Sequence, residues 1–196
     1  ATIATHSVHR TSSSSVDLMI KTLKFNDMVI GIVSWRAGCK RESKECIMPN
    51  AIELLKSDHD TVRDLLGQLT ETSSGAVKTR EKLLEKIGKE VSVHNRIEEE
   101  IFYPVFRDAN GKKNKEMYFE SKEEHRAVEA LVFPDLKETK PDSNEFSGRA
   151  KVLKELFEHH AEDEEQKMFP QAKECLSEEE LKELGEKMEK RKKELQ

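Results

Sequence analysis

The chain has 196 residues, of which 37% are charged, and its formal net charge is −5. Residues 1–50 carry seven Lys or Arg against four Asp or Glu, a net charge of +3, which leaves −8 on residues 51–196 and argues against nucleic acid as a partner. The most apolar window, residues 28–35, is far shorter than the roughly 20 residues of a membrane span. Long stretches rich in Glu, Lys and Leu favour amphipathic helices, so we expect a soluble all-α protein without a nucleic-acid or membrane partner.

Residues 1–48 differ in composition from the rest, and we predict two parts: an unassigned N-terminal extension over 1–48 and a helical domain over 49–196. The Ser/Thr-rich start is compatible with a targeting sequence, whereas Asp17 and Asp27 argue against one. An alternative is that translation begins at Met48. The three cysteines form neither a CxxC motif nor a disulfide framework, which favours a cytoplasmic protein, with organellar targeting by the extension as the open alternative.

Hydrophobic periodicity predicts four long helices. The first begins after a cap at Asn50 and the second ends near Pro104, each with apolar residues three and four apart. Their apolar stripes consist of Ile52, Leu55, Val62, Leu66 and Leu69 in the first helix and of Leu84, Ile87, Val91, Ile101 and Val105 in the second. The remaining segments are a turn over 108–113, helices over about 114–137 and 145–175, and a terminal helix after a capping box of Ser177 and Glu180. Short links between long helices predict an antiparallel up-and-down four-helix bundle with a short C-terminal helix.

The second pair of helices repeats the first at a fixed offset of 66 residues. The correspondence joins His59 to His125, His94 to His160, Glu98 to Glu164, Tyr103 to Phe169 and Pro104 to Pro170. In each half the two histidines are 35 residues apart, and the second one begins a His-x-x-x-Glu pair. Because residues four apart share one face of a helix, the histidine and the glutamate of each pair point the same way.

These polar residues fall inside the apolar stripes; His59, for example, stands between Leu55 and Val62. Burying unpaired imidazoles and carboxylates costs several kcal/mol for each charged group. Mutual hydrogen bonding can compensate one pair, but metal coordination is the more economical explanation for four histidines and two glutamates. A single His-x-x-x-Glu is usually a surface pair. His159 with Asp163 offers an alternative pair shifted by one residue, but the 66-residue repeat aligns His160, not His159, with His94.

The order His…His-x-x-x-Glu…His…His-x-x-x-Glu, the Leu-x-x-Asp-His opening at 55–59 and the aromatic–proline ending of each half resemble the hemerythrin-like, or HHE cation-binding, domain family over residues 48–194. The resemblance implies a non-heme di-iron centre with an oxo or hydroxo bridge. It implies a small ligand such as oxygen, another diatomic molecule or peroxide, held by two irons with terminal histidines and bridging glutamates. The metal ligands that it implies are His59, His94, Glu98, His125, His160 and Glu164.

Oxygen-carrying hemerythrins have a further histidine ligand four residues after the third, where this chain has Glu129. Glu129 is a candidate seventh ligand by its spacing from His125. Alternatively, Glu129 is an acidic residue on the edge of the bundle, which we favour. Ligand type alone does not distinguish iron from manganese or zinc, and the missing histidine weakens the case for oxygen carriage.

We predict a protein that binds metal and oxygen, or that senses iron or redox state, rather than a dedicated enzyme. Neutral imidazoles leave less negative charge for stabilising highly oxidised iron than a carboxylate-rich site would. The alternative is a redox enzyme, such as a ferroxidase, a peroxidase or an iron donor for iron–sulfur repair. A third reading is an interaction module whose fold is stabilised by metal loading. Glu99 and Glu165, beside the predicted ligands, either face solvent or orient a ligand histidine.

Overall fold

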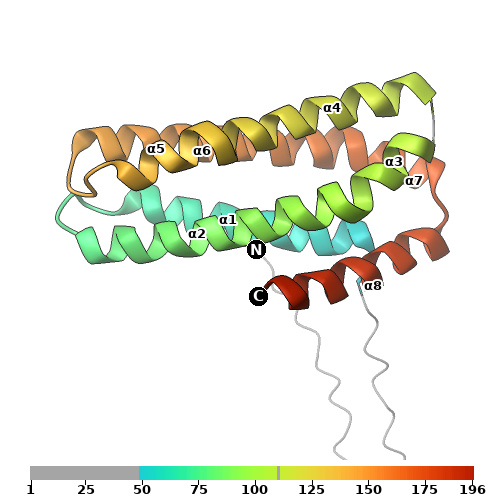
Figure 1. Ribbon diagram of the computed structural model, residues 1–196, viewed down its shortest axis with the longest axis horizontal. Helices are drawn as coiled ribbons and strands as arrows, with labels where there is room; N and C mark the ends of the chain where they lie inside the picture. Colours follow the sequence, from blue (N-terminus) through green and yellow to red (C-terminus); the bar gives the residue numbers. More distant parts are fainter. Residues whose placement is uncertain (1–48, 110) are drawn as a thin grey trace, which may run out of the picture. The chain divides into compact units, whose positions relative to one another are not determined.

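The computed structural model describes residues 49–109 and 111–196, and the extension predicted over 1–48 lies outside the described residues. Within the described ranges every regular element is helical (Figure 1). In chain order they are α1 (Ala51–Glu71), α2 (Val77–Ile97), η1 (Glu98–Phe102), α3 (Tyr103–Ala109), α4 (Gly111–Ala127), η2 (Val128–Val132), α5 (Phe133–Glu138), α6 (Asn144–Asp163), η3 (Glu164–Met168), α7 (Phe169–Cys175) and α8 (Glu178–Leu195). None of the helices in these ranges is long and apolar enough to cross a membrane.

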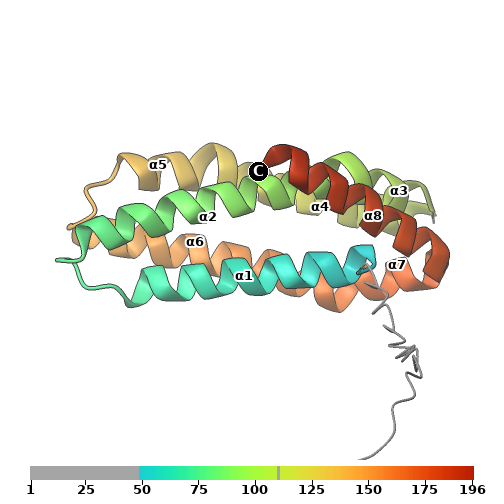
Figure 2. The same cartoon turned by 90° about the horizontal axis from the view of Figure 1, so that it is seen from below.

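Four antiparallel helical columns form the bundle (Figures 1 and 2). The first column is α1, and the others are α2–η1–α3, α4–η2–α5 and α6–η3–α7, each made of two α segments joined by a π-helical turn. The additional helix α8 crosses the bundle obliquely and contacts α1, α2 and η1 (Figure 2). The predicted all-α, up-and-down bundle with an added C-terminal helix is therefore confirmed.

Side-chain caps fix where several helices begin. The Asn50 side chain accepts a hydrogen bond from the Glu53 backbone N–H at 3.0 Å, and the Glu53 carboxylate accepts one from the Asn50 N–H at 3.1 Å. Ser177 and Glu180 form the same reciprocal box before α8, and the Ser143 hydroxyl accepts a first-turn N–H before α6 at 3.0 Å. These bonds satisfy N–H groups that have no partner within the helix, and they confirm the predicted cap and capping box.

Each π-helical turn is followed by an aromatic residue and a proline. The three dipeptides are Tyr103–Pro104, Phe133–Pro134 and Phe169–Pro170, and each aromatic N–H donates to a carbonyl five residues back, that of Glu98, Val128 or Glu164. Proline lacks an N–H and its ring clashes with the carbonyl four residues earlier in an α-helix, so a wider turn lets the column continue. The predicted end of the second helix near Pro104 is wrong, because that column continues to Ala109.

The turn predicted over 108–113 is shorter than expected. Helix α3 ends at Ala109 and α4 begins at Gly111, so that only residue 110, which lies outside the described residues, separates them. Gly111 has a φ of 63°, a value that glycine adopts without the penalty that a Cβ brings.

The extra residue of η1 also changes which side chains reach the core. The predicted stripe included Ile101 and Val105, yet Val105 is 39% exposed. Phe102, Tyr103 and Phe106 are completely buried instead. A π turn adds one residue to the helical repeat and so moves the core-facing positions one residue onward. The assignment of Val105 to the buried stripe is therefore wrong.

Arg80 ties together the two loops at one end of the bundle. Its guanidinium donates to the Thr72 carbonyl at 2.8 Å and the Pro141 carbonyl at 2.6 Å, and also to the hydroxyls of Thr72 and Ser147 at 2.8 and 3.0 Å. The Arg80 side chain is 3% exposed and lies over the Phe146 ring. A buried cation with all these acceptors satisfies loop carbonyls that the helices leave unpaired.

The interior consists of two apolar clusters. One gathers Leu55, Ile97 and Phe106 with the buried face of α8, and the other gathers residues toward the Arg80 end, such as Val62 and Val91. Along the columns the predicted histidines and glutamates lie where one cluster gives way to the other. The middle of the bundle is therefore a buried polar layer.

Candidate metal centre

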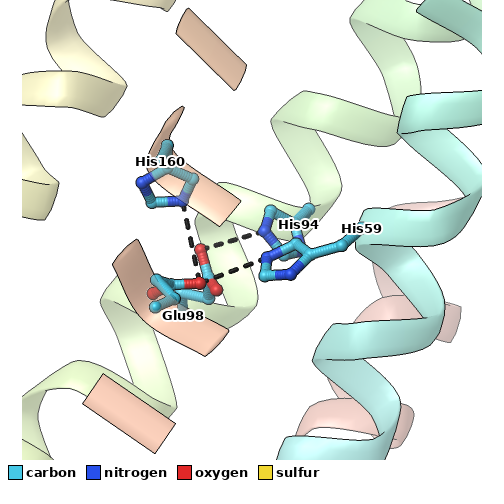
Figure 3. Close-up of side chains that lie close together, drawn as sticks. His59, His94, Glu98 and His160 are labelled. Atoms are coloured by element: carbon cyan, nitrogen blue, oxygen red, sulfur yellow. Dashed lines mark ion pairs between the residues drawn. The ribbon is translucent and has the colours of Figure 1, made fainter. Parts of the chain in front are cut away.

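Five of the six predicted ligands form one compact buried group. His59 comes from α1, His94 from α2, Glu98 from η1, His160 from α6 and Glu164 from η3, and each offers one nitrogen or oxygen within 4.8 Å of all the others. No residue of the group is more than 3% exposed. Figure 3 shows the three histidines converging with Glu98 from three separate columns. The bundle thus gathers donors that are up to 105 residues apart in the sequence.

The sixth predicted ligand, His125 on α4, adjoins this group. Its Nε2 lies 3.3 Å from Glu98 Oε2 and 3.2 Å from His160 Nε2. The four imidazoles form two close pairs, His59 with His94 at 4.8 Å between ring centroids and His125 with His160 at 4.7 Å. The structure therefore brings all six residues together, two histidines on each side of the glutamates.

Four further carboxylates face the outer nitrogens of the histidines. The Nδ1 atoms of His59, His125 and His160 lie 2.8, 3.0 and 2.9 Å from carboxylate oxygens, and that of His94 lies 3.9 Å from one. The carboxylates are, in the same order, Glu165, Glu99, Glu124 and Asp58. A carboxylate at Nδ1 keeps the proton on that nitrogen and leaves the Nε2 lone pair for the centre of the site.

The outer carboxylates follow the same 66-residue repeat as the ligands. Asp58 and Glu124 each precede a ligand histidine, and Glu99 and Glu165 each follow a ligand glutamate. Each of them serves a histidine on a neighbouring column rather than its own. Of the two readings of Glu99 and Glu165, the structure supports the one in which they orient a histidine.

Burial and neighbouring charges perturb the ionisation of the central residues. Burial raises the pKa of Glu98 well above its ordinary value, and the negative charge of Glu164 raises it further. Burial alone would also raise the pKa of Glu164, but His160 and His59 lower it overall. Burial lowers the pKa of His94 to about 4, so that its imidazole is neutral and able to bind a cation at neutral pH.

The donors fit a bound cation because several of them form no hydrogen bond among the described residues. His59 Nε2, His94 Nε2, Glu98 Oε1 and Glu164 Oε2 are buried and form no hydrogen bond within the described part of the chain. Each buried acceptor without a partner costs about 1 to 3 kcal/mol. Nitrogen and carboxylate donors around one centre suit iron, manganese and zinc, and a cation would satisfy all four atoms at once.

Glu129 and His159 lie outside the buried donors. Glu129 is exposed on η2 and accepts a hydrogen bond from the Asn95 side chain at 3.1 Å. This position agrees with the edge role that the sequence favours over a seventh ligand. The His159 side chain is 63% exposed, whereas His160 is buried. The 66-residue repeat therefore selects the histidine that faces the core.

Tyr103 is the residue of the site that sequence reasoning missed. Its hydroxyl donates to Glu164 Oε1 at 2.8 Å and lies 3.3 Å from His125 Nε2, and its ring stacks on the His125 ring. The side chain is completely buried. Its position follows from η1, because the extra residue of the turn swings Tyr103 toward the polar layer. The sequence signal that could have indicated its role is the hydroxyl that distinguishes Tyr103 from Phe169, the aromatic residue at the matching position of the second repeat.

A small cavity lies between α4 and η3, beside the site. It holds about 20 Å³ and is lined by Ser121, Glu124, Glu164 and Met168, among other residues. A space of this size admits about one water molecule. The cavity thus reaches a predicted ligand, Glu164, while offering room only for a very small molecule.

The fold and the site define a helical-bundle protein with a buried cage of histidines and carboxylates that can hold metal. Residues 50–172 match the family described as the hemerythrin HHE cation binding domain, and the chain belongs to this family. The match covers all six predicted ligands, Tyr103 and the four outer carboxylates, but it ends before α8.

Two individual proteins are similar to the chain. The crystal structure of a hemerythrin HHE cation binding domain-containing protein from Mycobacterium kansasii has a TM-score of 0.66 and 29% sequence identity, and the similarity covers 76% of this chain and 88% of that one. A protein from Nostoc sp. described as a DNA nickase is 28% identical over 134 residues, which are 66% of this chain and 35% of that protein. The chain thus matches about a third of the length of the Nostoc protein.

Proposed function

We propose that the chain is a non-heme di-iron protein that binds oxygen or a related small molecule, or that senses iron or redox state. The observation that carries this proposal is the set of buried Nε2 and carboxylate atoms that form no hydrogen bond within the described part of the chain. His59 with His94 and His125 with His160 would hold one metal each, and Glu98 and Glu164 would lie between the two metals. Bound iron would supply reversible binding, or reduction, of a small ligand.

The surroundings of the site support a small ligand over a bulky organic substrate. The cavity of about 20 Å³ beside Glu164 has room for about one water molecule, so a bulky substrate would not fit there. The phenylalanines Phe157 and Phe169 pack against His59 and keep that side of the site apolar. The negative charge of residues 51–196 gives no support for DNA as a partner, so we do not transfer the activity named for the Nostoc protein.

Metal analysis of anaerobically loaded protein tests the proposal. We expect about two ferrous ions per chain, and an optical spectrum that changes on mixing with oxygen and recovers when oxygen is removed. His94→Ala should lower the metal content. His159→Ala is the matched control, because this exposed histidine stands beside a ligand but points to solvent. Equal iron content in the His94 variant and the wild type would refute the assignment of the site.

A redox enzyme acting on peroxide is the second candidate, and Tyr103 favours it. A buried phenol hydrogen-bonded to Glu164 can donate a proton to a small molecule beside it. If peroxide is the substrate and Tyr103 is its general acid, Tyr103→Phe should slow its consumption about a hundredfold, the low end of the effect of general acid catalysis, while iron content is unchanged. Reversible oxygen binding at the same level in both proteins, without peroxide consumption, would leave only the first candidate.

A further inference from the structure

Helix α8 contributes one charged residue to the polar layer although it carries no predicted ligand. Leu181, Leu184 and Met188 anchor α8 in the apolar cluster that includes Leu55. Beyond this anchor, Lys192 reaches α1 and forms an ion pair with Asp58, which is 7% exposed. Asp58 is the carboxylate that faces His94. Asp58 therefore links Lys192 of α8 to the predicted ligand His94.

The pair of Asp58 and His94 is the one open pair among the four carboxylate–histidine pairs of the site. Asp58 Oδ2 lies 3.9 Å from His94 Nδ1, beyond hydrogen-bond distance, whereas the other three distances are 2.8 to 3.0 Å. Both of these atoms are buried and have no hydrogen-bond partner in the described chain. The other oxygen of Asp58 is held by Lys192.

The source of the cation distinguishes this pair from the Glu165–His59 and Glu99–His125 pairs. Glu165 contacts Arg63 at 2.8 Å and Glu99 contacts Lys122 at 3.1 Å, and each of these cations lies on the same helix as the histidine that the carboxylate serves. Lys192 instead comes from a helix outside the four columns. The side chain of Asp58 is also one methylene shorter than a glutamate, which limits its ability to reach a cation on one side and an imidazole on the other.

We propose that Lys192 is a positioning residue that withholds Asp58 from His94, so that α8 sets how firmly the His59–His94 side of the centre holds its metal. This inference rests on the proposed di-iron function. A histidine without a closed Nδ1 bond is less firmly oriented, since such outer partners typically contribute 10- to 100-fold in metal affinity. The chain therefore has one tightly held and one labile metal position, and undocking of α8 would remove the difference.

Release of iron to a chelator from the loaded full-length chain tests the proposal. We expect two phases of equal amplitude in the wild type. Lys192→Met should slow the fast phase about tenfold by letting Asp58 close on His94, and Lys192→Arg should keep the wild-type rates. Lys193→Met is the control, because Lys193 is exposed and adjacent. In an Asp58→Asn background, Lys192→Met should have no effect on the fast phase.

Proton NMR of the metal-free chain gives a second readout that does not depend on iron. An imidazole N–H held by a carboxylate resonates far downfield, so the Lys192→Met chain should gain one such resonance, assigned to His94. Unchanged release rates, faster release of both irons, or no new resonance would each overturn the proposal. Failure of the wild type to bind iron would refute the di-iron function instead, and the NMR result would still decide whether Lys192 holds Asp58 away from His94.

Discussion

Replacing Glu98 by glutamine should stabilise the metal-free chain and reduce the stability that the chain gains from metal. Glu98 is completely buried, its Oε1 has no hydrogen-bond partner, and its Oε2 lies 3.3 Å from Nε2 of both His94 and His125. In the metal-free chain the carboxylate has lost its hydration without full compensation, and burial raises its pKa well above the ordinary value. A bound metal ion would compensate the negative charge of Glu98, so that the carboxylate would then stabilise the metal-loaded chain.

The magnitude follows from the number of partners. A buried acceptor without a hydrogen bond costs about 1 to 3 kcal/mol, and a glutamine amide at this position can donate to the lone pair of His94 or His125, which a carboxylate cannot. We therefore expect the metal-free Glu98→Gln chain to be more stable than the metal-free wild type by about 1 to 3 kcal/mol. With metal at a hundredfold excess over its dissociation constant, the wild type gains about 2.7 kcal/mol, and the variant gains less.

Urea unfolding under anaerobic conditions measures both effects, once with a chelator and once with ferrous iron. Glu100→Gln is the matched control, since Glu100 lies in the same π turn but pairs with Arg96 and Arg191 on the surface. A change of less than about 1 kcal/mol is expected for the control in both conditions. If the metal-free Glu98 variant were less stable than the metal-free wild type, Glu98 would be a structural partner of the histidines. If both proteins gained equally from iron, Glu98 would not be a ligand.

Substitutions at four further positions test the packing and capping of the bundle by urea unfolding. Gly185→Ala should destabilise the chain by about 1 to 3 kcal/mol, because the added Cβ would lie 2.4 Å from the Pro49 carbonyl oxygen. In contrast, the Cβ of Gly67→Ala meets no atom within 4 Å, so this change should stabilise α1 by up to about 1 kcal/mol. An equal loss of stability in both variants would contradict this reading. Arg80→Met should cost at least about 2 kcal/mol, because the carbonyls of Thr72 and Pro141 lose a charged donor, and a smaller loss would mean that water replaces the guanidinium. Asn50→Ala should cost about 1 kcal/mol through loss of the α1 cap, and the same loss in Asn50→Asp, which retains an acceptor, would exclude the cap as the cause.

The positions of the six predicted ligands could be predicted because the sequence contains the site twice. The offset of 66 residues selects His160 over its neighbour His159, a choice that helical periodicity alone leaves open. The outer carboxylates obey the same offset, yet a glutamate beside a ligand is compatible with both a solvent-facing and an orienting role. Deciding between the two requires knowing which column lies next to it, and that is a property of the folded bundle.

The π turns explain most of what the sequence did not show. Counting at the period of an α-helix from His94 and Glu98 leads to Val105, whereas the extra residue of η1 places Tyr103 and Phe106 in the interior. The aromatic–proline dipeptides mark all three π turns, but proline is also typical of helix ends, so the same signal supported the wrong boundary near Pro104. The ion pair of Lys192 with Asp58 joins residues 134 positions apart and has no counterpart in the repeat.

The location of the polar layer between two apolar clusters has a consequence for how the site is held. Each cluster is held by apolar contacts among its own residues, so the columns are fixed on both sides of the site even where the donors have no hydrogen-bond partners. The apolar packing thereby offsets part of the free-energy cost of burying the donors, so that the metal is not the only compensation. The cluster nearer the C-terminus includes α8, which also holds Asp58 through Lys192. Changes in the docking of α8 would therefore act on the site through packing and through charge at the same time, and only Lys192 variants separate the two effects, because Lys192 lies outside the apolar anchor.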